Sequence, residues 1–174
     1  IFGGYVNFIK NYNKTAIIYD GKEISYSEVI ANSKVLASKS NMKKQDKAII
    51  YMENKPEFLF SFLGIWENRG VCVCLDAGLS ADELIYFIED SEAKCIYTSK
   101  QNLENVKNAL KKLERELEIV VADEVDYNEI KLEKHQEFIK APEPSDVSLM
   151  LYTSGTTGKP KGVMLTFDNI LVNL

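Results

Sequence analysis

The chain has 174 residues, of which 45% are hydrophobic and 27% charged, a balance typical of a globular domain with a hydrophobic core. Its net charge of −5 argues against binding to nucleic acid or to an anionic membrane surface, because basic patches drive both. No stretch approaches the roughly eighteen apolar residues of a membrane-spanning helix, so we expect no membrane span. Three cysteines and one histidine argue against a disulfide framework or a metal site, and are typical of a reduced, cytoplasmic protein.

Apolar runs and amphipathic segments alternate along the chain. Runs of apolar and β-branched residues predict strands at residues 16–19, 48–52, 71–75, 94–98, 119–122 and 147–152. Helices are predicted between most of them, beginning near residues 25, 55, 80 and 103. Repeated strand–helix–strand units predict right-handed crossovers. We therefore expect an α/β fold with a largely parallel sheet flanked by helices.

Several helix boundaries carry local signals. Ser25 and Ser80 each precede a glutamate by three residues, the pattern of a capping box, and Asn54 is the predicted capping side chain before Pro56. Apolar residues at helical spacing extend the fourth helix from residue 103 to Leu117. Residues 123–145 lose this periodicity, and we interpret them as a surface excursion with a short helix around 127–132.

The most informative segment follows the strand at 147–152. Residues 151–162 hold four serine or threonine hydroxyls, three glycines and two lysines between apolar stretches. Glycines let backbone N–H groups converge on anionic oxygens, hydroxyls donate further hydrogen bonds, and lysines supply positive charge. This combination indicates a site for a polyphosphate.

The loop is not a Walker-type loop. Pro160 follows Lys159, where a Walker loop has the serine or threonine that binds Mg²⁺, and residues 163–165 predict a strand where that motif has a helix. The G-x-G-x-x-G dinucleotide fingerprint is also missing. We therefore expect a strand–loop–strand arrangement.

The segment Tyr152–Gly162 resembles the signature loop of the adenylate-forming (AMP-binding) enzymes, which include acyl-CoA synthetases, adenylation domains of nonribosomal peptide synthetases and luciferases. Residues 24–29 resemble the family's early L-T-Y-x-E-L segment, and residues 53–58 its E-N-x-P-E-F helix start. Such segments run in the family's order from about Thr15 to Asn169. The resemblance implies that residues 1–174 form a single partial domain, the N-terminal part of an AMP-binding domain, with the signature loop at 152–162.

The resemblance also implies a two-step reaction. A carboxylate attacks the α-phosphate of Mg²⁺-bound ATP, giving an acyl-adenylate and pyrophosphate, and a thiol, commonly that of coenzyme A, then takes the acyl group. The signature loop holds the β- and γ-phosphates, so the expected nucleotide-binding residues are Thr153, Ser154, Gly155, Thr156, Thr157, Gly158, Lys159 and Lys161. The sequence does not rank the two lysines, and Thr153 and Lys161 could instead belong only to the flanking strands.

The family's Mg²⁺ ligand, ribose-binding aspartate and C-terminal lysine would lie beyond residue 174. We therefore assign no catalytic or metal-binding residue here, and expect the chain to be an N-terminal fragment that is inactive alone. Ala77 and Phe167 stand where the family often has proline and histidine. Phe167 would lie near the acyl pocket, although its helical spacing with Ile170 and Leu171 also suits a core position.

Three functions are consistent with these features. The first is an ATP-dependent carboxylate–CoA ligase acting on a fatty or other apolar acid. The second is an amino-acid-activating adenylation domain, whose acceptor is a carrier-protein thiol. The third is a nucleotide-binding module without catalysis.

Overall fold

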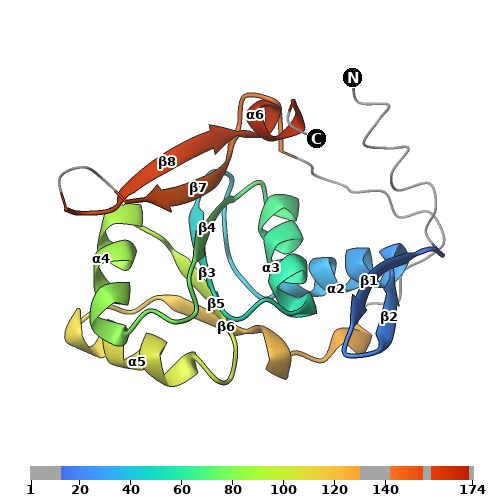
Figure 1. The fold of residues 1–174 in the computed structure, drawn as a ribbon, viewed down its shortest axis with the longest axis horizontal. Coiled ribbons are helices and arrows are strands. Elements are labelled where there is room, and N and C mark those ends of the chain that lie inside the picture. Colours follow the sequence, from blue (N-terminus) through green and yellow to red (C-terminus); the bar gives the residue numbers. More distant parts are fainter. Residues whose placement is uncertain (1–12, 130–141, 155–157, 173–174) are drawn as a thin grey trace.

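The computed structural model describes residues 13–129, 142–154 and 158–172, and its centre is a six-stranded sheet (Figure 1). The strand order is β6-β5-β3-β4-β7-β8. All neighbouring pairs are parallel except β7 and β8, which are antiparallel. The strands are β3 (Lys47–Tyr51), β4 (Val71–Leu75), β5 (Cys95–Thr98), β6 (Glu118–Val121), β7 (Val147–Thr153) and β8 (Lys161–Thr166). The predicted largely parallel α/β sheet is confirmed.

Helices cover both faces of this sheet (Figure 1). Helices α2 (Tyr26–Ser38) and α3 (Pro56–Glu67) pack against one face, and α4 (Ala81–Ser91) and α5 (Leu103–Lys112) against the other. Successive residues of a strand point to opposite faces, so Ile50 lies in the core beside α3 while Ile49 lies in the core beside α4. Burial on both faces explains why these strands are apolar without a break.

A strand hairpin and a short helix lie outside this three-layer arrangement. Strands β1 (Thr15–Tyr19) and β2 (Lys22–Ser25) form a separate antiparallel hairpin before α2. The turn residue Gly21 has a φ of 73°, which suits glycine. Helix α6 (Phe167–Leu171) follows β8, and its N-terminus is closed by Thr166 and Asn169.

The predicted helix starts are confirmed with one exception. Both capping boxes form, because the hydroxyls of Ser25 and Ser80 accept the N–H groups of Glu28 and Glu83 at 3.3 Å. Helix α3 begins at Pro56, as predicted. The prediction that Asn54 caps it is wrong: the N-cap residue is Lys55, and no side chain caps this helix.

The fourth predicted helix is too long. Helix α5 ends at Lys112, and Leu117 lies beyond it. Glu114 has a φ of 49°, in the left-handed region, which an α-helix cannot contain. The apolar spacing continued past this point because Leu113 and Leu117 both pack on the α4–α5 core from outside the helix.

The excursion after β6 begins as short 3₁₀ turns at Ala122–Glu124 and Tyr127–Glu129. Tyr127 packs edge-on against Phe60 with ring centroids 5.7 Å apart, so this part belongs to the core and not only to the surface. Residues 130–132 of the predicted helix lie outside the described residues. None of the helices in the described part of the chain is long and apolar enough to span a lipid bilayer.

Candidate phosphate-binding hairpin

Strands β7 and β8 form an antiparallel hairpin that carries the glycine- and hydroxyl-rich loop at its tip (Figure 1). Thr153 pairs with Lys161 where the strands meet the loop. The loop lies at the carboxyl end of β7, and therefore at the same edge of the parallel sheet as the carboxyl ends of β3, β4, β5 and β6. Ligands of open α/β sheets bind at this edge. The predicted strand–loop–strand arrangement is confirmed.

The hairpin extends beyond the strand beside it. β7 pairs with β4 only through Leu149 and Met150, so residues 151–153 have β8 as their one strand neighbour among the described strands. Leu151 and Val163, opposite each other in this extension, are 39% and 45% exposed. The part of the hairpin next to the loop therefore extends past the edge of β4 and is exposed on the side of these two residues.

Five of the eight expected phosphate-binding residues are described, and all five are exposed. They are Thr153, Ser154, Gly158, Lys159 and Lys161. Thr153 does end β7, as its alternative interpretation predicted, but as an exposed residue it can also contact a ligand. Gly158 has a φ of 88°, which favours glycine. Gly155, Thr156 and Thr157 lie outside the described residues.

The structure separates the two lysines that the sequence did not rank. Lys161 is in β8, opposite Thr153, so the two side chains share one face of the hairpin. Lys159 precedes β8, and its Nζ lies 5.7 Å from the centroid of the Tyr86 ring on α4. Lys161 therefore lies beside the Thr153 hydroxyl, and Lys159 lies beside helix α4.

Helix α4 holds the base of the loop through side chains that the sequence analysis did not single out. The Tyr86 hydroxyl donates to the Pro160 carbonyl at 2.6 Å, and the Tyr152 hydroxyl donates to Asp90 Oδ2 at 2.8 Å. The rings of Tyr152 and Phe87 pack edge-on at 4.7 Å. Burial, followed by the bond to the Asp90 carboxylate, raises the pKa of the Tyr152 hydroxyl above its usual value.

Gly162 allows β8 to pack closely on side chains of β7, whereas Gly155 and Gly158 were assigned to phosphate contact. A Cβ at this position would lie 2.0 Å from Met150 Cε and 3.4 Å from Tyr152 Cε1. Met150 and Tyr152 occupy the α4 side of β7, where they contribute to the core beside that helix. Glycine here lets β8 lie close against both side chains.

Comparison with known proteins identifies the family. The family model described as "AMP-binding enzyme" matches residues 8–174. The chain belongs to this family. The resemblance to adenylate-forming enzymes is thereby confirmed, and it extends to nearly the whole length of the chain.

Individual AMP-binding relatives are similar at moderate identity. The chain is 29% identical to 2-succinylbenzoate–CoA ligase of Bacillus velezensis, over 90% of this chain and 31% of that protein. It is 27% identical to tyrocidine synthase 1 of Brevibacillus parabrevis, over 91% of this chain and 14% of that protein. The chain thus spans about a third, or less, of the length of these two relatives.

Solved structures of AMP-binding enzymes share the fold. O-succinylbenzoate coenzyme A synthetase from Bacillus subtilis in complex with AMP superimposes with a TM-score of 0.75, at 26% identity. The match covers 97% of this chain and 43% of that chain. The same enzyme in complex with ATP and magnesium ion gives a TM-score of 0.78 at 24% identity, over 97% and 44% of the two chains.

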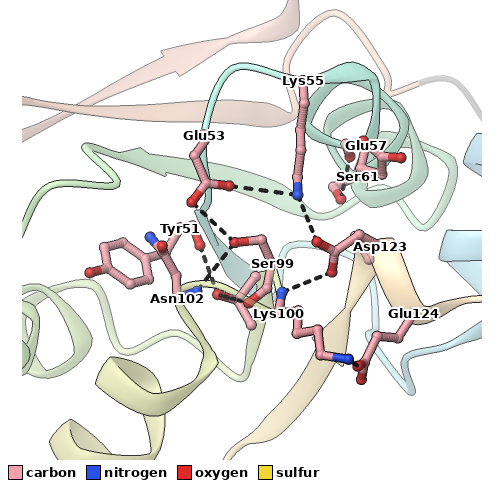
Figure 2. Close-up of polar contacts among 12 residues, drawn as sticks. Tyr51, Glu53, Lys55, Glu57, Ser61, Ser99, Lys100, Asn102, Asp123 and Glu124 are labelled. Carbon is pink, nitrogen blue, oxygen red and sulfur yellow. Dashed lines mark hydrogen bonds and ion pairs between the residues drawn. The ribbon is translucent and has the colours of Figure 1, made fainter.

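A second polar cluster lies at the same edge of the sheet, beyond the ends of β3, β5 and β6 (Figure 2). Lys55 Nζ donates to Asp123 Oδ2 at 2.7 Å and lies 3.6 Å from Glu53 Oε2. The Lys100 N–H donates to Asp123 Oδ1 at 2.8 Å, and the Ser99 hydroxyl to Glu53 Oε1 at 3.3 Å. Every charge among Glu53, Lys55 and Asp123 has a partner, so the cluster joins strand ends and offers no free cation to a ligand.

Burial and charge pairing shift the pKa values of this cluster in opposite directions. Desolvation raises the pKa of Asp123, but hydrogen bonds from Lys55 and the Lys100 N–H outweigh it and leave that pKa below its usual value. Desolvation lowers the pKa of Lys55, but the bond to Asp123 together with the charges of Asp123, Glu53 and Glu57 outweighs it and leaves that pKa above its usual value. Sequence reasoning missed the cluster because Lys55 and Asp123 are 68 positions apart.

Metal and thiol chemistry have no candidate in the described part of the chain. No three His, Cys, Asp or Glu residues gather there into a group that could hold a metal ion. Cys72, Cys74 and Cys95 are free thiols, and burial raises the pKa of Cys74 to about 12.

Phe167 is 2% exposed and packs edge-on against Trp66 with ring centroids 5.2 Å apart, as its core interpretation predicted.

Proposed function

We propose that residues 1–174 form the N-terminal part of the AMP-binding domain of an ATP-dependent carboxylate–CoA ligase. The enzyme forms an acyl-adenylate from ATP and a carboxylic acid, then transfers the acyl group to the thiol of coenzyme A. One observation carries this proposal. A chain of the AMP-binding family presents exposed hydroxyls and two lysines on a hairpin at the carboxyl edge of its sheet. The CoA-ligase activity of the Bacillus velezensis relative supports the choice of acceptor.

In this function the loop binds the phosphates that leave as pyrophosphate. Negative charge builds on those phosphates as the bond to the α-phosphate breaks, and donors placed to follow that charge stabilise the transition state. We assign this role to the hydroxyls and lysines of the loop, namely Thr153, Ser154, Thr156, Thr157, Lys159 and Lys161. Gly155 and Gly158 allow the backbone to approach the phosphates.

Magnesium accompanies ATP in this proposal, and in a bound state it neutralises phosphate charge. We assign it no ligand in this chain, because the family resemblance places the Mg²⁺ ligand beyond residue 174. The role that we assign to the loop residues is hydrogen bonding and lysine charge.

For the acid, we propose a fatty or other apolar molecule. The support is Phe167, an apolar side chain where the family resemblance places a frequent histidine near the acyl pocket. Phe167 is buried against Trp66, so it would support an apolar pocket from within the core and would not contact the acid itself. Burial of apolar groups of the acid in such a pocket is favourable.

Two other functions remain as alternatives. The similarity to tyrocidine synthase 1 favours an amino-acid-activating adenylation domain, whose acyl group would pass to a carrier-protein thiol. A Walker-type nucleotide-binding module without catalysis is disfavoured, because the residues after the lysine–proline pair form strand β8 and not a helix.

The proposal is tested by ATP–pyrophosphate exchange. The full-length protein that carries this segment is assayed with fatty acids, aromatic acids and amino acids, and we expect exchange with an apolar acid. Exchange with amino acids alone would establish the first alternative. ATP binding without exchange for any acid would establish the second and refute a ligase.

Lys161→Ala makes the same assay specific for the hairpin. Loss of a charged hydrogen bond of about 1.5–3 kcal/mol predicts a decrease in kcat/KM for ATP of roughly tenfold or more. Lys107→Ala, which removes an exposed lysine of α5, is the matched control and should not alter the exchange rate. Equal effects of the two substitutions would show that Lys161 does not take part in phosphate binding.

A further inference from the structure

We propose that Tyr86 is the residue that positions Lys159 for phosphate binding. This inference rests on the proposed function, because it concerns a lysine of the same loop. Tyr86 belongs to α4 and is not part of the signature loop. It acts on the loop from outside and contacts no reacting atom.

Tyr86 holds two consecutive residues at the loop exit with two different parts of its side chain. Its ring faces the Lys159 ammonium, with Nζ 5.7 Å from the ring centroid, within the distance at which a cation is attracted to an aromatic face. Its hydroxyl donates to the Pro160 carbonyl at 2.6 Å. The first contact locates the charge, and the second locates the backbone that carries it.

The helix that bears Tyr86 is itself well anchored. Its N-terminus is closed by the Ser80–Glu83 capping box, and Leu84 and Ile88 are fully buried beneath it. Next to Tyr86, the Tyr152 hydroxyl bonds to Asp90, which ties the same helix to β7. Tyr86 therefore fixes Lys159 relative to a rigid element.

This arrangement has a direct consequence for catalysis. Lysine has a long side chain, and immobilising it on binding costs about 1.5–2 kcal/mol of conformational entropy. A lysine already restrained near its working position loses less on binding phosphate, and such preorganised charge stabilises a transition state more strongly. Lys161, in β8 opposite Thr153, takes its position from the strand.

The contact itself is tested on the 174-residue chain by NMR of the Lys159 side chain. The Tyr86 ring should shift the Lys159 Hε resonances upfield, and Tyr86→Leu should abolish that shift. Tyr86→Phe keeps the ring and should retain most of it, while Tyr152→Phe removes only the bond to Asp90 and should retain it fully. An unchanged Lys159 resonance in Tyr86→Leu would overturn the proposal.

The positioning role is tested by a double-mutant cycle in the exchange assay of the full-length protein. We expect Tyr86→Leu to lower kcat/KM for ATP about tenfold, and to lower it much less once Lys159 is replaced by alanine, because only the bond to the Pro160 carbonyl is then left to lose. A purely structural role for Tyr86 predicts that the two losses multiply, which would overturn the proposal. Tyr127→Phe is the matched control for Tyr86→Phe. It removes the hydrogen bond from the Tyr127 hydroxyl to the Ala122 carbonyl, which has the same length as the bond from Tyr86 to Pro160.

The two experiments separate failure of this inference from failure of the proposed function. If the full-length protein shows no exchange with any acid, the ligase proposal fails, and the NMR result still decides whether Tyr86 holds Lys159. If exchange occurs but the losses multiply, the ligase stands and the role of Tyr86 is refuted.

Discussion

Asp146 at the start of β7 combines burial with several compensating contacts. Its side chain is 8% exposed, and its carboxylate lies 2.8 Å from Lys44 Nζ and accepts the Glu143 N–H at 3.0 Å. Its carbonyl accepts the N–H of Phe167 at 2.9 Å, which joins the start of the hairpin to α6. No local pattern in the sequence marks this aspartate, because Lys44 is about a hundred positions away.

These contacts predict a pH dependence of stability. Burial raises the pKa of Asp146, but the bonds from Lys44 and Glu143 and the charge of Arg69 outweigh it, so the pKa lies below the usual 3.8. The ionised form therefore stabilises the fold above about pH 4, and this contribution is lost as the pH falls through the lowered pKa. We expect Asp146→Asn to be less stable than the wild type at pH 7, with a difference that shrinks below pH 4.

Urea unfolding at pH 7 and pH 3 measures this difference. Asp20→Asn, at the exposed turn between β1 and β2, is the control and should leave the free energy of unfolding unchanged at both pH values. A destabilisation by Asp146→Asn that is equally large at pH 3 would show that the charge of Asp146 is not responsible.

At the scale of elements, strands and helix starts were predictable, whereas the end of α5 and the contacts between helices were not. Capping boxes at Ser25 and Ser80 are local in sequence, so they could be identified before the fold was known. The end of α5 depends on a left-handed Glu114, a residue type that gives no such signal. The contact between α2 and α3 depends on Gly64, whose importance appears only when the two helices are placed together.

Gly64 allows α3 to approach the backbone of α2. A Cβ at this position would lie 2.7 Å from the Ser33 carbonyl oxygen and 3.1 Å from the Ala37 nitrogen. Because backbone atoms cannot move aside as a side-chain tip can, Gly64→Ala should destabilise the fold by about 1–3 kcal/mol despite the better helix propensity of alanine. Thermal or urea unfolding measures the loss.

Gly78→Ala is the matched control for this substitution. Gly78 lies in an exposed turn, and its nearest neighbour is a side-chain oxygen of Asp76 at 3.3 Å. We expect a much smaller change there. Equal losses at Gly64 and Gly78 would contradict the close packing of α2 on α3 as the cause.

At the scale of the whole molecule, the hairpin is exposed and the chain spans about a third of its CoA-ligase relative. A nucleotide bound at the loop therefore meets contacts on one side only. We expect the 174-residue chain to bind Mg²⁺-bound ATP more weakly than micromolar, because few contacts offset the entropy lost on binding. Isothermal titration calorimetry measures this affinity, and micromolar binding by the chain alone would refute the expectation.

The sequence by itself determined the α/β class, the strand positions and the family, and it predicted the loop that we propose binds phosphate. These properties depend on residues close together in the chain, namely apolar periodicity, capping pairs and the loop that ends in Lys159-Pro160-Lys161-Gly162. Only the tertiary structure decided which lysine faces which element. Lys159 meets Tyr86 because α4 and the β7–β8 hairpin lie side by side, and the Lys55–Asp123 pair forms because β3 and β6 end at one edge of the sheet. Such contacts join residues about 70 positions apart, and no local pattern specifies them.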